Sequence, residues 1–252
     1  MINNVCHTFS KQALKTILVA TIVGTSAYVN AAITLDRTRI IFNGDQKSTT
    51  VTIYNKNKDL PYLAQAWLEN DQAVKVNSPF VIVPPIQRVE PNQASQVRIE
   101  ALPIVEKLPQ DRETIYYFNL REVPPKSDKA NVLQVALQSR IKLFYRPSNL
   151  MITSNELMNK PWQAELVLLK KDNQLVAKNP TAYYTTIIGA KNSQNKSIQN
   201  FEAIMISPFS EKTVKLSPTV LGNSPTLIYV NDYGGKEELK YECKVTECLA
   251  KK

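Results

Sequence analysis

Short segments that alternate between apolar and polar positions recur from residue 32 to the end of the chain. They are rich in Val, Ile, Thr, Tyr and Phe, and clusters of Pro, Asn, Asp and Lys separate them. This pattern predicts β-strands joined by turns. The expected strands are Ile33–Leu35, Arg39–Phe42, Ser48–Asn55, Tyr62–Glu69, Phe80–Val83, Gln87–Val89, Ser95–Ala101, Thr114–Val123 and Val132–Tyr145, then Glu165–Lys170, Gln174–Asn179, Tyr183–Lys191, Phe201–Ile206, Glu211–Val214, Thr226–Asn231 and Leu239–Lys244.

Two sets of about seven short strands predict an all-β chain of two antiparallel β-sandwiches in tandem. No long stretch has the helical period, although Trp162–Leu168 could form one helical turn. Between the two sets, the Arg146-Pro147 step favours extended geometry, and Ser and Asn cluster around it, as in a linker. We therefore expect one domain at residues 32–147 and a second at 148–252.

The first 31 residues have the three-part layout of a secretory signal peptide. Lys11 and Lys15 precede the apolar run Thr16–Val23, and Val29 and Ala31 suit a small-residue cleavage site. The run is shorter than the ~20 residues that a membrane span needs. A short buried N-terminal helix is the alternative. Cleavage after Ala31 would leave 221 of the 252 residues, and no later stretch is apolar enough for membrane insertion.

The chain carries a formal net charge of +9, which falls to +7 once the two leader lysines are removed. A basic balance can indicate nucleic-acid binding, but export and the dispersed charges argue against it. A diffuse positive surface that helps to capture protein partners fits better.

The two cysteines outside the leader, Cys243 and Cys248, are expected to form a disulfide in an oxidising compartment. Half of a zinc site is the alternative, but it needs two more ligands. Cys6 and His7 both lie in the leader, and no other Cys or His follows. We therefore expect no metal site.

Candidate catalytic chemistry is scarce. Without histidine beyond the leader, no Ser–His triad can form, although a Ser–Lys site stays formally open. The chain has no Gly-rich phosphate loop, and carboxylates such as Asp111 and Glu113 could pair by chance in any sandwich. We expect no catalytic residues and no cofactor, and the sequence points to binding rather than turnover.

The run Asn131–Tyr145 is unusually long for a strand and contains neither Gly nor Pro. Leu133, Val135 and Leu137 alternate with Gln134, Ala136 and Gln138, as in a half-buried strand. On this pattern alone, a long core strand is favoured over an edge strand whose apolar row is offered to a partner.

Two cations bear on that choice. Arg39 lies early in the first domain, and Lys142 lies between Ile141 and Leu143. A cation inside an apolar strand is costly unless an anion meets it. An internal salt bridge, a solvated flank and a site for an external anion all remain open.

Several motifs in the same order closely resemble those of the PapD-like periplasmic pilus chaperones, over essentially the whole length after the leader. The stretches are Leu35–Arg39, Leu60–Trp67, Pro84–Arg88, Leu108–Pro124, Lys142–Pro147 and Asn231–Gly235. The resemblance implies two immunoglobulin-like sandwiches set in an L shape, with a ligand cleft between them and a location in the periplasm. It also implies donor-strand complementation, in which a chaperone strand fills the groove of an incomplete pilus subunit.

The resemblance also assigns roles to residues of this chain. Leu133, Val135 and Leu137, with Asn131 at the end of the row, would be the donor residues. Arg39 and Lys142 would bind the subunit's C-terminal carboxylate, and Glu113, Arg146 and Asp232 would form an inter-domain ion network. The expected partners are pilus subunits, the outer-membrane usher and a second copy in a self-capping homodimer. The short loop Val123–Ala130 is similar to that of the short-loop branch.

One detail does not fit a regular strand. The donor residues are odd-numbered and Lys142 is even-numbered, so they would face opposite sides. A twist or bulge near Ser139–Arg140, or a cleft that wraps both faces, is expected. The alternative function is a secreted β-sandwich structural protein such as a pilus subunit or adhesin.

Overall fold

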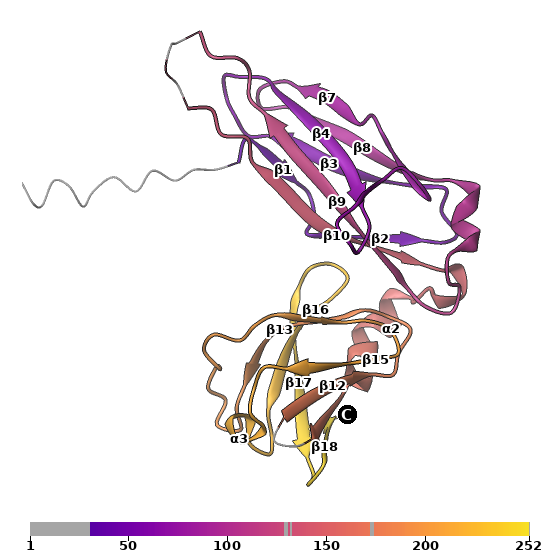
Figure 1. Ribbon diagram of the computed structural model, residues 1–252, viewed down its shortest axis with the longest axis vertical. Coiled ribbons are helices and arrows are strands. Elements are labelled where there is room, and N and C mark those ends of the chain that lie inside the picture. Colours follow the sequence, from indigo (N-terminus) through magenta and orange to yellow (C-terminus); the bar gives the residue numbers. More distant parts are fainter. Residues whose placement is uncertain (1–30, 129–130, 132, 172–173, 252) are drawn as a thin grey trace, which may run out of the picture. The chain divides into compact units, whose positions relative to one another are not determined.

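The computed structural model describes residues 31–128, 131, 133–171 and 174–251, and these form two β-sandwiches (Figure 1). The expected all-β, two-domain fold is therefore confirmed. The expected signal peptide lies outside the described residues, apart from Ala31. No helix within the described part is long and apolar enough to cross a membrane.

The first sandwich consists of two sheets. One has the order β1-β3-β8-β6, and the other has the order β2-β10-β9-β4-β5, with β7 also paired to β4. Their strands are β1 (Ile33–Leu35), β2 (Arg39–Asn43), β3 (Ser48–Asn55), β4 (Tyr62–Glu69), β5 (Lys75–Val76), β6 (Phe80–Val83), β7 (Ile86–Val89), β8 (Ala94–Ala101), β9 (Thr114–Val123) and β10 (Gln138–Arg146).

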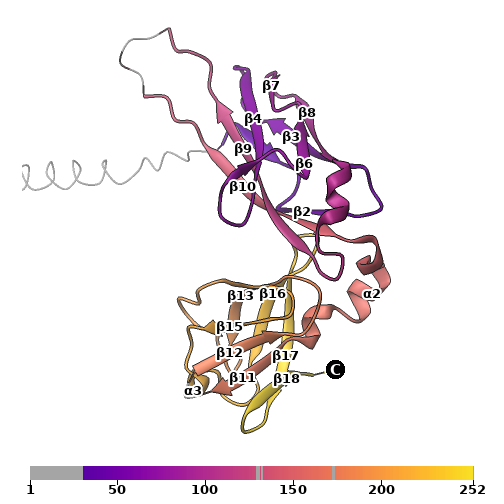
Figure 2. The same ribbon diagram turned by 45° about the vertical axis from the view of Figure 1, so that its right-hand side comes forward.

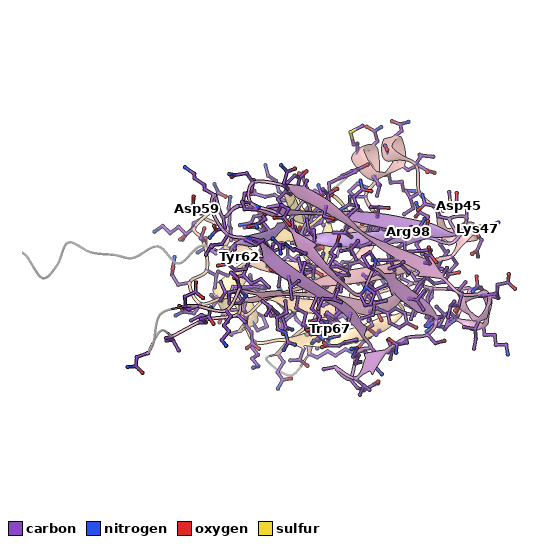
Figure 3. The ribbon with its side chains drawn as sticks, turned by 90° about the horizontal axis from the view of Figure 1, so that it is seen from above. Asp45, Lys47, Asp59, Tyr62, Trp67 and Arg98 are labelled. Carbon is purple, nitrogen blue, oxygen red and sulfur yellow. A yellow bond between two sulfur atoms is a disulfide. The ribbon has the colours of Figure 1, made fainter. Side chains whose placement is uncertain are left out.

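The core of the first sandwich follows from the alternation of its strands. In β3, Val51 and Ile53 are fully buried, and in the neighbouring strand β8 Val97, which pairs with Val51, and Ile99 are buried as well. The inward side chains of both sheets form one apolar cluster, which includes the fully buried Phe42. Figure 3 shows the side chains from above, with Tyr62 and Trp67 of β4 labelled.

The second sandwich has one continuous path of strands, β14-β13-β16-β17-β18-β11-β12-β15. Its strands are β11 (Val167–Lys171), β12 (Gln174–Asn179), β13 (Thr185–Lys191), β14 (Ile204–Ile206), β15 (Ser210–Val214), β16 (Thr226–Val230), β17 (Lys236–Cys243) and β18 (Glu247–Ala250). A separate apolar cluster fills it, so each sandwich has its own core.

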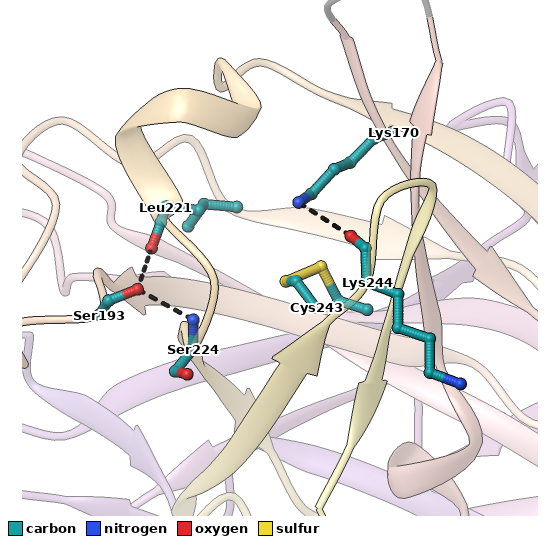
Figure 4. The surroundings of a disulfide bond; sticks show 7 residues. Lys170, Ser193, Leu221, Ser224, Cys243 and Lys244 are labelled. Carbon is teal, nitrogen blue, oxygen red and sulfur yellow. Dashed lines mark hydrogen bonds between the residues drawn. A yellow bond between two sulfur atoms is a disulfide. The ribbon is translucent and has the colours of Figure 1, made fainter.

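The predicted disulfide between Cys243 and Cys248 is present, and it joins β17 to β18 at directly paired positions. Close to it, the ammonium group of Lys170 donates a hydrogen bond to the carbonyl oxygen of Lys244 at 3.2 Å (Figure 4). The disulfide thus closes the hairpin through which the path of strands turns from β17 to β11.

Short helical segments connect the strands. They are η1 (Pro103–Lys107), η2 (Ser148–Leu150), α2 (Ser154–Asn159), η3 (Trp162–Glu165) and α3 (Pro218–Leu221). The helical turn considered at Trp162 is η3. Helix α2 was not predicted, although its capping box was readable in the sequence: the Thr153 hydroxyl accepts from the Glu156 backbone, and the Glu156 carboxylate accepts from the Thr153 backbone.

The long strand expected at Val132–Tyr145 is shorter in the structure. Strand β10 begins at Gln138, the segment 133–137 belongs to no strand, and Val132 lies outside the described residues. The pairing of Gln138 with Arg121 would place Pro124 and Pro125 opposite the expected donor segment. Proline has no backbone N–H to donate to a ladder, so β9 cannot continue as the partner of that segment.

Candidate functional site

Arg39 and Lys142 are direct neighbours across a pair of parallel strands. Strand β2 lies beside β10 at the edge of its sheet (Figure 2), and Lys142 pairs with Arg39 in register. Side chains at paired positions project from the same face of a sheet. The fold therefore brings together two cations that are 103 residues apart in sequence.

Neither cation has a carboxylate of its own within salt-bridge distance in the described ranges. The Arg39 guanidinium donates to the carbonyl oxygen of Val230 at 3.2 Å, and its Nε is buried without a partner. Arg39 also lines a cleft of about 440 Å³, whose other lining residues include Arg37, Asp36 and Asp232. Two adjacent cations with unused donors have the chemistry that binding of an anion requires.

Burial, together with the nearby charges of Arg39 and Lys212, lowers the pKa of Lys142 to about 8. Burial also lowers the pKa of Arg39, although Asp232 and Glu113 oppose this. Each cation is therefore less favourable here than in water. A bound carboxylate would relieve this unfavourable state.

The bulge expected near Ser139–Arg140 is absent, because the pairing of β10 with β9 is continuous from Gln138 to Tyr145. Odd-numbered Leu143 and Tyr145 point into the core of the first sandwich. Lys142 projects from the other face, and its ammonium group donates to the Thr186 hydroxyl of β13 at 3.1 Å. The alternative expectation, a cleft that wraps both faces, stays a prediction.

The three residues expected as donors are exposed to different degrees. Leu133 is 87% exposed and Val135 is 54% exposed, whereas Leu137 is half-buried. The carbonyl oxygen of Leu137 accepts a hydrogen bond from the Glu122 backbone at 3.0 Å. The core-strand interpretation is therefore wrong for Leu133 and Val135, which leave a row of apolar surface open. Asn131 is exposed as well.

Glu113, Arg146 and Asp232 form one connected ion network. The Arg146 guanidinium donates to Glu113 Oε1 through Nε at 2.9 Å and through Nη2 at 2.8 Å, and it donates to Asp232 Oδ2 at 2.8 Å. The backbone N–H of Tyr184 donates to the second oxygen of Glu113 at 2.8 Å. Glu113 and Arg146 belong to the first sandwich, and Asp232 and Tyr184 to the second.

This network is almost entirely buried, with Arg146 and Glu113 each 3% exposed. Burial raises the pKa of Glu113 to about 7, and the charge of Arg146 opposes this increase. Burial likewise disfavours the charged Arg146, but Glu113 and Asp232 raise its pKa overall. The charges are satisfied only as a set, because removing one leaves another buried without a partner.

Thr186 was not singled out in the sequence, since a threonine within a β-strand carries no local signal of function. The described residues contain no cluster of three or more His, Cys, Asp or Glu side chains that could hold a metal ion. What the site offers instead is a pair of adjacent cations, one of which, Lys142, lies in the strand that follows the exposed apolar segment.

Two family models match the chain, one for each sandwich. Residues 32–151 match the family model for the N-terminal domain of PapD, a pili and flagellar-assembly chaperone, and residues 161–241 match the model for the C-terminal domain of the pili assembly chaperone PapD.

Individual relatives agree with these matches. Chaperone protein PapD of Escherichia coli is 49% identical over 225 residues, which cover 88% of this chain and 91% of the relative. Chaperone protein PmfD of Proteus mirabilis (strain HI4320) is 40% identical over 245 residues, which cover 95% of each chain. The crystal structure of the CupB2 chaperone of Pseudomonas aeruginosa has a TM-score of 0.67 at 28% identity, and the match covers 84% of this chain and all of that one.

Proposed function

The chain belongs to the PapD-like family of pilus-assembly chaperones, and from this membership we propose that it holds immature pilus subunits by donor-strand complementation. The observation that carries the proposal is that Arg39 and Lys142 are paired across two strands and that no carboxylate among the described residues forms a salt bridge with either of them. Lys142 lies in β10, the strand that follows the exposed apolar segment. The cationic pair would bind the subunit's C-terminal carboxylate, and the segment would fill its open groove.

The two parts of the site perform different tasks. Main-chain hydrogen bonds and the apolar side chains at 133, 135 and 137 supply affinity, and burying each side chain contributes roughly 1.5–3 kcal/mol. The carboxylate contact sets the register, because a slip by one residue would turn every side chain to the opposite face. Leu137 and Lys142 are five residues apart, or about 16 Å in an extended strand.

We further propose that the protein works in the periplasm, where the expected signal peptide would deliver it and where a disulfide such as Cys243–Cys248 persists. The ion network of Glu113, Arg146 and Asp232 would hold the domains at 32–147 and 148–252 in the arrangement that the subunit needs. Delivery to the outer-membrane usher, a self-capping homodimer, the L shape and the short-loop branch stay predictions of the resemblance.

Replacing Leu133 and Val135 together with serine should abolish subunit capture and leave the chaperone folded. Both side chains are exposed, so the free energy of unfolding should change by less than about 0.5 kcal/mol. The measurement is recovery of subunits that co-purify with the tagged chaperone from periplasm, together with a urea midpoint.

The matched control replaces Met158 and Val245 with serine, because these apolar side chains are also exposed, at 76% and 91%, but lie in the second half of the chain. The control should recover subunits like the wild type. Wild-type protein that recovers no subunit would contradict the proposed function. Loss of chaperone stability in the Leu133/Val135 variant would restore the core-strand interpretation.

Subunit affinity should decrease as the pH rises through about 8, the pKa of Lys142 in the free protein. The carboxylate binds the ammonium form, so affinity should be constant below about pH 7 and fall by up to tenfold per unit above about pH 8. Arg39 from β2, Lys212 from β15 and Tyr117 at the paired position of β9 are the titratable neighbours.

The check is fluorescence anisotropy with a labelled subunit peptide between pH 6.5 and 9.5. Lys142→Arg is the control, because a guanidinium stays charged throughout this range. A wild-type affinity that does not change with pH would show that the charge of Lys142 takes no part in binding.

A further inference from the structure

We propose that the Thr186 hydroxyl is a third member of the carboxylate site, which positions the ammonium group of Lys142 and donates its own hydrogen bond to the bound carboxylate. The inference rests on the proposed function. It adds a contribution from the second sandwich to a site whose two cations both belong to the first.

The hydrogen-bonding capacity of the hydroxyl carries the argument. A threonine hydroxyl has one proton to donate and two lone pairs that accept. The Thr186 oxygen accepts from Lys142 Nζ at 3.1 Å, and this is the single hydrogen bond of that side chain among the described residues. Its proton is therefore free to be donated, and the group that holds the ammonium can also bind the anion that the ammonium attracts.

Strand geometry sets Thr186 apart from its neighbours. Thr185 is 1% exposed and its hydroxyl is buried without a partner, and Ile187 belongs to the core of the second sandwich. Thr186 projects from the opposite face of β13, as alternation along a strand requires. The hydroxyl that meets Lys142 is thus held on strand β13 rather than on a loop.

A third cation lies next to this hydroxyl. Met205 of β14 pairs with Thr186, and the Met205 carbonyl oxygen accepts a hydrogen bond from Lys212 Nζ at 3.2 Å. Lys212 is close enough to lower the pKa of Lys142. The Thr186 side of the site therefore has positive potential, which favours a carboxylate over a neutral group at this position.

The test is to replace Thr186 with valine, which keeps the shape of the side chain and removes the hydroxyl. The probes are two labelled forms of a synthetic peptide from the C-terminus of a subunit that co-purifies with the wild type, one with a free carboxylate and one amidated. We expect Thr186→Val to weaken binding of the free-carboxylate peptide about 5- to 20-fold and to leave the amidated peptide unchanged. Thr186→Ser should restore most of the loss.

Thr185→Val is the matched control, since it removes the hydroxyl of the adjacent threonine on the core side. It should not change the ratio of the two affinities. A second measurement is the pKa of Lys142 by carbon-detected NMR of the lysine side chain in the full-length protein. Thr186→Val should lower this pKa, because the ammonium form loses its acceptor.

The outcomes separate the inference from the function on which it rests. If the wild type binds both peptides equally, the carboxylate site itself is wrong. If the wild type prefers the free carboxylate and Thr186→Val keeps that preference, Thr186 has no part in the site. If Thr186→Val weakens both peptides equally, its role is structural and the proposal is also overturned.

Discussion

Replacing Arg146 with methionine should lower the free energy of unfolding by about 3–5 kcal/mol. The change removes the donor of three hydrogen bonds and leaves the carboxylate of Glu113 buried without its cation. Arg37→Met is the matched control, because Arg37 forms its ion pair with Asp36 at the surface. That pair should contribute no more than about 1 kcal/mol.

Urea unfolding followed by tryptophan fluorescence can assign the loss to each sandwich. The chain has two tryptophans, Trp67 in β4 and Trp162 in η3, so the backgrounds Trp67→Phe and Trp162→Phe report the sandwiches separately. Because the network has members from both, both transitions should move to lower urea. A loss below about 1 kcal/mol, or a shift of one transition alone, would contradict the network's proposed role in joining the domains.

Replacing Arg39 and Lys142 together with methionine should weaken subunit binding by roughly 10²- to 10⁴-fold. Each cation is expected to supply a charge-assisted hydrogen bond of about 1.5–3 kcal/mol to the carboxylate. The apolar segment would remain, so weak binding without a fixed register should persist. The measurement is the same anisotropy titration with the free-carboxylate peptide.

The single variant Lys142→Met, although it weakens binding, should stabilise the free protein. The lowered pKa of Lys142 shows that the folded state disfavours its charge, so removing the charge should stabilise the fold at pH 7. We expect a gain of about 1 kcal/mol, reduced from the full shift because the ammonium is partly exposed. A variant that binds subunits normally would contradict the role of Lys142 in binding. A variant that loses stability would contradict the expected gain from removing the charge.

Local pattern was enough to predict many of the strands. Strands such as β3 and β9 have the predicted bounds because core residues recur at every second position, at Val51 and Ile53 in β3 and at Tyr116, Phe118 and Leu120 in β9. The hairpin strand β18 was missed because four residues around Cys248 present no clear alternation. Strand β10 was predicted too long, because alternation at Leu133, Val135 and Leu137 reports which residues could line a face but not whether a partner strand exists.

Less of the candidate site than of the fold could be predicted from the residues alone. A parallel pairing between Arg39 and Lys142 joins distant parts of the chain, and no spacing rule predicts it; the resemblance to a known family suggested it. The contact of Lys142 with Thr186 depends on the second sandwich, and the sequence of its strands does not indicate which residues of the first sandwich they contact. Long-range geometry of this kind is decided by packing, which one sequence does not display.

The two prolines at 124 and 125 have a consequence for how a bound subunit could leave. They stop β9 from continuing its pairing beyond the hydrogen bond between Glu122 and Leu137, so we expect residues 133–136 to acquire a strand partner only when a subunit binds. Fixing the backbone of each residue costs on the order of 1–2 kcal/mol, and binding must meet that cost over these four residues. We expect the complex to be firm enough to protect the subunit yet less stable than one with a donor already in strand geometry. A competing donor strand could then replace the chaperone without any input of chemical energy.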